Sequence, residues 1–150
     1  MCGPASLKIV LDYYGVSQSE KELAKLTGTT KVLGTDAAGL TKAAKQLGFK
    51  VSIKNNSTFS DIEKWLQKGA PPIVNWFTKG RKDYPNSEVA DGHYSVVCGI
   101  DDKYIYLQDP EIGDIRKIEK NDFKKVWFDF SGEFIKPKEL ITRQIIAVYK

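Results

Sequence analysis

The apolar residues of this 150-residue chain change their spacing near its middle, and this change constrains the fold more than any other feature. In the first half they recur every three or four residues, as in helices with one buried face. In the second half, short runs rich in Val, Ile and Tyr are separated by turn residues, as in an antiparallel sheet. The pattern predicts an α+β fold in which an N-terminal helical half packs on a C-terminal antiparallel sheet.

Four helices are expected in the first half, and residues that favour helix ends mark their limits. Pro4 suits the first turn of a helix. Ser19 and Ser60 are each followed three residues later by a glutamate, which is the pattern of a capping box. Glycines close the helices, because glycine readily adopts the left-handed conformation found at helix C-termini. The expected helices run from Gly3 to Gly15, Ser19 to Gly28, Asp36 to Leu47 and Ser60 to Gly69.

Strands are expected where short β-branched or aromatic runs are bounded by turn residues. They run from Phe49 to Ile53, Ile73 to Phe77, His93 to Ile100, Tyr104 to Gln108, Ile115 to Ile118 and Gln144 to Tyr149. Short turns join the third, fourth and fifth, which indicates an antiparallel meander. Asn121 is expected to cap a short helix toward Val126. Residues 78–92 are polar and are expected to form a functional surface loop. Without a repeat or linker, residues 1–150 are expected to form a single domain.

Charge and hydropathy exclude several classes of protein. The chain carries 23 basic and 19 acidic side chains, a net charge of +4, and its lysines are scattered among acids. We therefore expect no nucleic-acid partner. No apolar run reaches the roughly 18 residues of a membrane-spanning helix, and the first residues do not resemble a signal peptide. We expect a soluble cytoplasmic domain that needs no cofactor and does not itself insert into a membrane.

Cys2 has a position that favours chemical reactivity, because a predicted helix begins directly after it. The unpaired N–H groups and the positive end of that helix favour a thiolate, which is the nucleophilic form of cysteine. Two alternatives remain. Cys2 is a small buried residue, or it forms a disulfide with Cys98. Cys98 lies in an apolar strand and is expected in the core.

His93 and Asp109 are expected to lie together at one end of the sheet. His93 is the only histidine and opens a strand, and Asp109 follows the next strand. If the two strands pair with Ile100 beside Tyr104, both side chains lie at the same open end. A carboxylate there accepts the imidazole N–H, fixes its tautomer and stabilises the cation. The alternatives are a structural histidine and a simple Asp-Pro turn.

The chain order Cys, His, Asp is the order used by papain-like cysteine peptidases. Five blocks carry a closer resemblance, and these are Cys2 to Leu7, Gly34-Thr35, Leu47-Gly48-Phe49, Gly92 to Val97 and Asp109-Pro110. On these blocks the chain resembles the bacteriocin-processing, double-glycine leader peptidase family over nearly its whole length.

That resemblance implies a papain-like cysteine peptidase fold with Cys2 as nucleophile, His93 as general base and Asp109 as the orienting acid. It also implies a peptide substrate, namely a leader peptide cut after a Gly-Gly pair. The implied partner is an ABC exporter, fused to the domain or associated with it, which would hold the domain at the inner face of the membrane.

The chain departs from the family ahead of the nucleophile. Only Met1 precedes Cys2, so the family's oxyanion-stabilising glutamine has no counterpart. Loss of one oxyanion donor typically lowers the rate by about 10² to 10³. The backbone N–H of Cys2 would be one donor, and the side-chain amides of Asn75 and Gln108 are candidates for a second. We expect a truncated piece of a longer protein, and a natural short form or a degenerate relative are the alternatives.

The predicted reaction is acyl transfer from a peptide carbonyl to Cys2, followed by hydrolysis of the thioester. Trp76 or Trp127 would form the wall of a narrow channel for small residues, unless these side chains lie in the core. An amidase or transpeptidase, an inactive peptide-binding relative, and an amino-terminal nucleophile exposed by loss of Met1 remain open. A metal site made of the three residues is a further class, but the chain has no closely spaced pair of ligands.

Overall fold

The computed structural model describes residues 2–29, 36–77, 93–110, 112–129 and 140–150, and for Cys2 only the backbone. The helices are α1 (Cys2–Tyr13), α2 (Glu20–Thr27), α3 (Ala37–Gln46), α4 (Phe59–Gln67) and α5 (Lys120–Val126). The strands are β1 (Lys50–Lys54), β2 (Ile73–Trp76), β3 (His93–Ile100), β4 (Tyr104–Asp109), β5 (Asp114–Glu119), β6 (Phe128–Asp129), β7 (Ile141–Thr142) and β8 (Ile145–Tyr149). Within these ranges no helix has the length and apolar character needed to cross a bilayer.

Six strands form one antiparallel sheet in the order β1-β8-β2-β3-β4-β5, and β6 pairs separately with β7. The predicted meander is confirmed, because β3, β4 and β5 are successive neighbours in the sheet. β1, from the helical half, pairs with β8 at the end of the chain. The α+β fold class is therefore confirmed, with one strand of the first half built into the sheet of the second.

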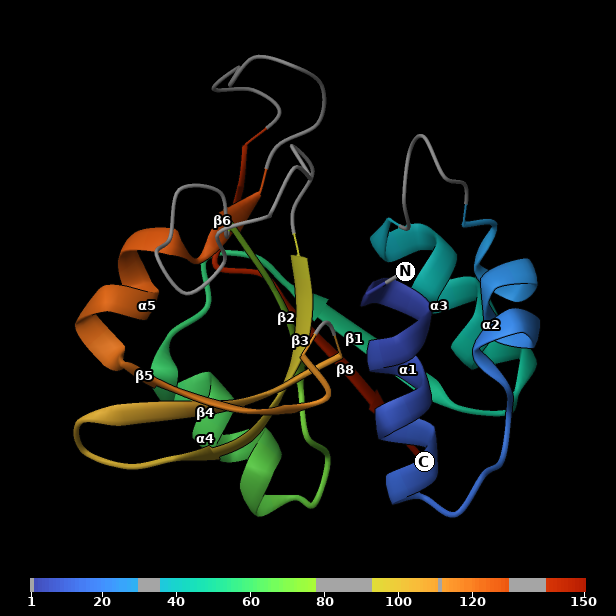
Figure 1. The fold of residues 1–150 in the computed structure, drawn as a ribbon, viewed down its shortest axis with the longest axis horizontal. Helices are drawn as coiled ribbons and strands as arrows, with labels where there is room; N and C mark the ends of the chain where they lie inside the picture. Colours follow the sequence, from blue (N-terminus) through green and yellow to red (C-terminus); the bar gives the residue numbers. More distant parts are fainter. Residues whose placement is uncertain (1, 30–35, 78–92, 111, 130–139) are drawn as a thin grey trace.

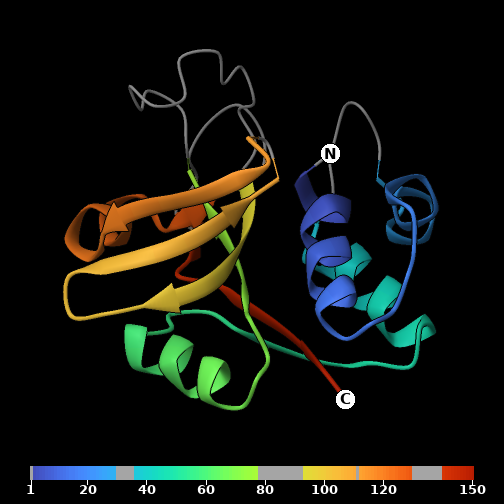
Figure 2. The ribbon, with the colours of Figure 1, turned by 60° about the horizontal axis from the view of Figure 1, so that its bottom comes forward.

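Helices cover the sheet from two sides. α1, α2 and α3 lie together on one side, while α4 and α5 lie toward β4 and β5 on the other, as Figure 1 and the turned view in Figure 2 both show. Each side has its own apolar core. The first core includes Leu7, Leu11, Leu40, Tyr94 and Val148. The second core includes Trp76, Val97, Leu107, Phe123 and Trp127.

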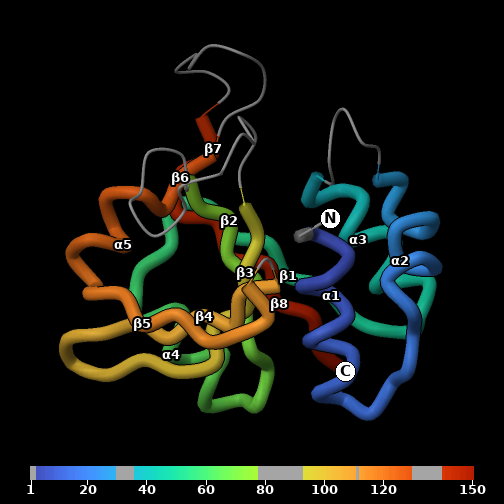
Figure 3. Tube along the Cα trace, viewed as in Figure 1, coloured from blue at the N-terminus to red at the C-terminus, as the bar shows by residue number. Residues whose placement is uncertain are grey.

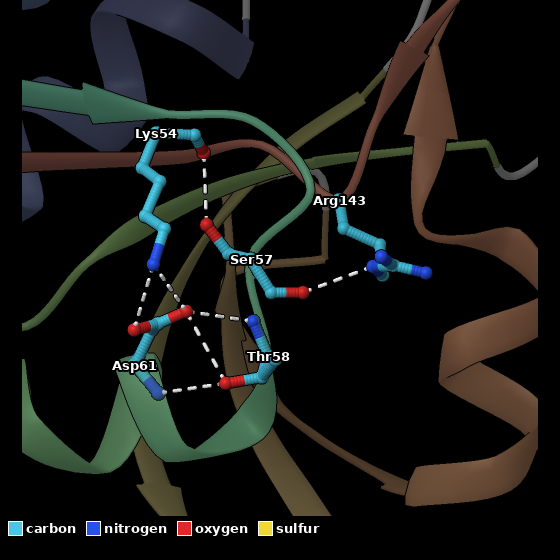
Figure 4. A network of polar contacts seen from close by, with 5 residues as sticks. All are labelled: Lys54, Ser57, Thr58, Asp61 and Arg143. Carbon is cyan, nitrogen blue, oxygen red and sulfur yellow. Dashed lines mark hydrogen bonds and ion pairs between the residues drawn. The ribbon is translucent and has the colours of Figure 1, made fainter.

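The N-terminal cap of α4 differs from the prediction. Thr58, not Ser60, is the capping residue: its Oγ1 accepts the N–H of Asp61, and the Asp61 carboxylate accepts the N–H of Thr58. Figure 4 shows that Lys54 also donates to Asp61. Two capping-box patterns overlap here in the sequence, and the ion pair with Lys54 favours the earlier one.

Two further differences concern the end of the sheet. Asn121 is not the cap of α5, because β5 runs directly into the helix and Glu119 takes the cap position without a side-chain hydrogen bond. β6 and β7 were not predicted, since strands of two residues show no alternation of polar and apolar side chains. Figure 3 shows the trace of this short ribbon beside β2 and α5.

Candidate active site

His93 and Asp109 form a buried hydrogen bond, with 2.7 Å between His93 Nε2 and Asp109 Oδ1. The side chain of His93 is 7% exposed and that of Asp109 is not exposed. β3 and β4 are adjacent antiparallel strands, so the first residue of β3 lies near the last residue of β4. The structure thus brings together two of the three residues that the sequence singled out.

A β-bulge determines that the two side chains share a face of the sheet. Next to the turn, Ile100 pairs with Ile105, but beyond the bulge Val97 pairs with Leu107. The predicted pairing of Ile100 with Tyr104 is therefore wrong by one residue at the turn. Side chains alternate along a strand. If the pairing next to the turn continued without the bulge, with every residue of β3 paired in sequence, His93 and Asp109 would lie on opposite faces of the sheet. The bulge restores the common face.

Arg116 joins this pair, and the sequence reasoning missed it. Arg116 Nε lies 2.7 Å from Asp109 Oδ2, and the arginine side chain is only 10% exposed. β5 carries Arg116 opposite Leu107 of β4, one same-face position away from Asp109. The predicted β4–β5 hairpin was a signal for this contact, because neighbouring antiparallel strands can place an arginine and an aspartate side by side. Their common face follows from the observed register.

The surroundings of His93 favour its neutral form. Burial first, then the positive charge of Arg116 and that of the chain's amino terminus, lower the pKa of His93 from 6.5 to about 4. At neutral pH the ring is therefore an imidazole. With Asp109 accepting a hydrogen bond at Nε2, the proton belongs on Nε2 and the basic lone pair on Nδ1.

Trp76 packs beside the pair but does not line an open channel. It pairs with His93 in the β2–β3 register, and the two rings meet edge-on with 5.8 Å between their centroids. Trp76 is 0% exposed and Trp127 is 1% exposed. The channel-wall prediction is therefore wrong for both rings as they lie in this structure, because a fully buried ring has no surface to offer a substrate.

The two amides proposed as oxyanion donors differ in their availability. Asn75 is 2% exposed and its Nδ2 donates to Asp129 Oδ2 at 2.9 Å, so its N–H group already has an acceptor. Gln108 is exposed, and it lies on the face of β4 opposite to Asp109 because it directly precedes it. Neither residue contacts His93 in the hydrogen bonds that the structure describes.

Cys2 opens α1, as the sequence predicted, and the position of its side chain lies outside the described part of the chain. α1 packs against β3. Figure 1 and Figure 3 show that α1 begins at the end of the molecule where β3 also begins. The N-terminal N–H groups of the helix and the buried His93–Asp109 pair therefore lie at the same end.

Cys98 differs from its prediction as a core residue. It is an exposed free thiol at the β-bulge, so it forms no disulfide with Cys2. Its Sγ donates to the carbonyl oxygen of Tyr106 at 3.5 Å, and partial burial raises the pKa of the thiol. Both features disfavour a thiolate at Cys98. The loop expected at residues 78–92 lies outside the described residues.

Comparisons with known proteins agree on one family. The model of the Peptidase C39 family matches residues 1–135. The chain is 32% identical over 132 residues to the lactococcin transport/processing ATP-binding protein LcnC-like of Lactococcus lactis, which covers 87% of the chain and 17% of that protein. The chain thus spans about a sixth of the length of such relatives.

Solved structures lead to the same group of domains. The peptidase domain of Streptococcus ComA, a bi-functional ABC transporter involved in quorum sensing, superposes with a TM-score of 0.73 at 26% identity, over 99% of this chain and 90% of that one. A double glycine motif protease from an AMS/PCAT transporter, solved in complex with its leader peptide, gives 0.67 at 23% identity, over 99% and 83%. The second likeness is one of fold.

Proposed function

This chain belongs to the peptidase C39 family, and from that premise we propose that it is a cysteine peptidase in which Cys2 is the nucleophile, His93 its general base and Asp109 the group that orients the histidine. The observation that carries the proposal is the buried hydrogen bond of 2.7 Å between His93 and Asp109. It lies at the end of the molecule where the helix that starts at Cys2 begins.

The proton transfer would use Nδ1 of His93. Asp109 binds Nε2 and holds the tautomer in which Nδ1 carries the lone pair. The lowered pKa of His93 keeps that lone pair unprotonated at neutral pH. Asp109 opposes this shift once the ring is protonated, because its carboxylate stabilises the imidazolium that forms.

Acyl transfer would proceed in two halves. Nδ1 takes the thiol proton, and the sulfur of Cys2 attacks the scissile carbonyl carbon. The C–N bond then breaks as His93 returns the proton to the leaving amine, which leaves a thioester on Cys2. Water, deprotonated by His93, attacks the thioester, and the proton goes to the departing sulfur. One peptide bond and one water are consumed per cycle.

The oxyanion would be held at the start of α1. The N–H groups of the first turn of a helix have no partner within the helix, so the backbone N–H of Cys2 is one donor. Neither side-chain candidate is placed beside His93: the N–H group of Asn75 is bound to Asp129, and Gln108 is exposed but lies on the face of β4 opposite to Asp109.

The proposed substrate is a leader peptide that ends in a pair of glycines. Relatives of this chain are named transport/processing proteins, and one structural neighbour is a double glycine motif protease bound to its leader peptide. Glycines before the scissile bond leave the backbone open to approach in a confined site. By the same likeness, we propose a cytoplasmic site of action beside an ABC exporter.

Cleavage of a synthetic leader peptide tests the proposal. The wild-type chain should cut a peptide with a Gly-Gly site after the second glycine, as mass spectrometry of the products would show. Cys2→Ala should abolish cleavage, while Cys98→Ala, which removes the other thiol, should leave it unchanged. Tight binding of the peptide without any cleavage would contradict a peptidase and favour a peptide-binding relative of the same fold.

A further inference from the structure

Both oxygens of the Asp109 carboxylate are engaged by charged or ionisable nitrogens. Oδ1 bonds to Nε2 of His93 and Oδ2 to Nε of Arg116, each at 2.7 Å. Asp109 has no exposed surface, so these contacts replace its hydration. The three side chains come from the consecutive strands β3, β4 and β5 of the meander.

We propose that Arg116 is a positioning residue of this site, which fixes the rotation and the charge of Asp109 and thereby the tautomer and proton affinity of His93. The proposal rests on the proposed function, because it assigns a further residue to the same reaction. Arg116 is not itself a catalytic residue, since it acts on His93 through Asp109 and through its charge.

Burial explains why the carboxylate needs such a partner. Removing an ionised carboxylate from water costs several kcal/mol, and a neutral imidazole does not offset that cost. A guanidinium within hydrogen-bond distance supplies the missing charge and keeps the carboxylate ionised. Only an ionised Asp109 is a pure acceptor, and only a pure acceptor holds the proton of His93 on Nε2.

Geometry adds to the effect of charge. A carboxylate anchored at one oxygen alone can rotate about its side-chain bonds, whereas contacts at both oxygens fix its plane. The contact uses Nε of a planar guanidinium, and the compact ammonium of a lysine cannot reproduce that direction. Even a substitution that preserves the charge, such as Arg116→Lys, should therefore disturb the orientation of the Asp109 carboxylate toward His93.

The charge of Arg116 also acts on His93 directly. Among the described residues, Asp109 on β4 bonds to the ring and Arg116 on β5 lowers its pKa, as does the positive charge of the amino terminus; Trp76 on β2 packs against the ring and has no ionisable group. Asp109 favours the imidazolium, and Arg116 opposes it. The pair therefore holds a ring that accepts a proton during the reaction and releases it afterwards.

NMR titration of the imidazole tests this role without any substrate, because His93 is the only histidine in the chain. Chemical shifts of the ring nitrogens report both tautomer and pKa. Arg116→Gln removes the charge, Arg116→Lys keeps it, and Lys117→Gln is the matched control, since it makes the same charge change at an exposed position of the same strand. Arg116→Met serves if Arg116→Gln does not fold.

The expected result for Arg116→Gln is a His93 pKa higher by about 1 unit and a mixture of tautomers in place of the Nε2–H form. Arg116→Lys should keep the wild-type pKa. Both Arg116→Gln and Arg116→Lys should lower kcat/KM for a cleavable peptide by roughly 10- to 100-fold, because Asp109 no longer holds His93 in a fixed orientation. Lys117→Gln should match the wild type.

The proposal would be overturned if Arg116→Gln, or Arg116→Met in its place, had the same His93 pKa and tautomer as Lys117→Gln. Arg116 would then be a structural residue, whatever the activity of the variants. A wild-type chain that cuts no peptide would contradict the proposed function alone, since the titration reads the pair in the resting protein.

Discussion

At the scale of single residues, His93 is held by contacts on several sides. Asp109 binds one ring nitrogen, Trp76 meets the ring edge-on, and the side chain is 7% exposed. The sequence indicated His93 and Asp109 because both lie at strand ends. Arg116 could not be chosen in the same way, since its contact depends on which residues of β4 and β5 face one another.

The stability of the protein should fall as acid protonates His93. The pKa of His93 is lowered from 6.5 to about 4 in the folded chain, mainly by burial, so the folded state disfavours the charged ring. The neutral ring therefore makes its full contribution to the free energy of unfolding above pH 6.5. As the pH falls from 6.5 toward 4, the free energy of unfolding decreases by about 3 kcal/mol. Urea unfolding at several pH values in this range measures the loss.

His93→Gln is the matched variant for this measurement, because it keeps a polar side chain but has no group that titrates. Its free energy of unfolding should depend less steeply on pH between 6.5 and 4 than that of the wild type. Equal slopes in both proteins would show that other groups produce the acid sensitivity.

At the scale of elements, the capping and stop residues identified most helices, and glycines at their ends adopt the predicted left-handed conformation, as Gly28 does with φ of +69°. Prediction failed where two signals overlapped, as at Thr58 and Ser60, and where an element was too short to show a period, as in β6. Packing and ion pairs decide such cases, and a single sequence does not display them.

The close approach of α2 and α3 depends on Gly39. A Cβ built at this position would collide with the carbonyl oxygen of Thr27. Gly39→Ala should therefore lower the free energy of unfolding by about 1–3 kcal/mol, because backbone atoms must move apart. Urea denaturation measures this change. Ala38→Ser, at the exposed neighbouring position, should change the free energy of unfolding by less than about 0.5 kcal/mol. An equally small change for Gly39→Ala would contradict the expected collision.

The bulge in β3 offers a sharper test of register. Deletion of Cys98 removes the extra residue between Val97 and Gly99, and Val97 then precedes Gly99 directly with Leu107 still as its partner. The pairing beyond the bulge is unchanged, so His93 stays on the face of Asp109. We expect the deletion variant, like Cys98→Ser, to keep the Nε2–H tautomer of His93 in an NMR titration. Loss of that tautomer in the deletion variant alone would contradict this register.

At the scale of the whole molecule, the candidate site lies where the helical half meets the sheet. α1 brings its N-terminus and β3, β4 and β5 bring His93, Asp109 and Arg116. The change of apolar spacing in the sequence predicted these two halves, and the chain order of Cys, His and Asp assigned one reactive group to the first and two to the second. The arrangement of six strands, with β1 beside β8, required the structure.

The rate of alkylation of Cys2 shows whether its thiol is activated and whether His93 serves it as a base. In a Cys98→Ser background, iodoacetamide should modify Cys2 near neutral pH much faster than a free thiol with a pKa of about 8.5. His93→Ala should remove most of that advantage, because the thiol then has no base. A Cys2 that reacts no faster than a free thiol, and equally fast with and without His93, would contradict the assignment of nucleophile and base.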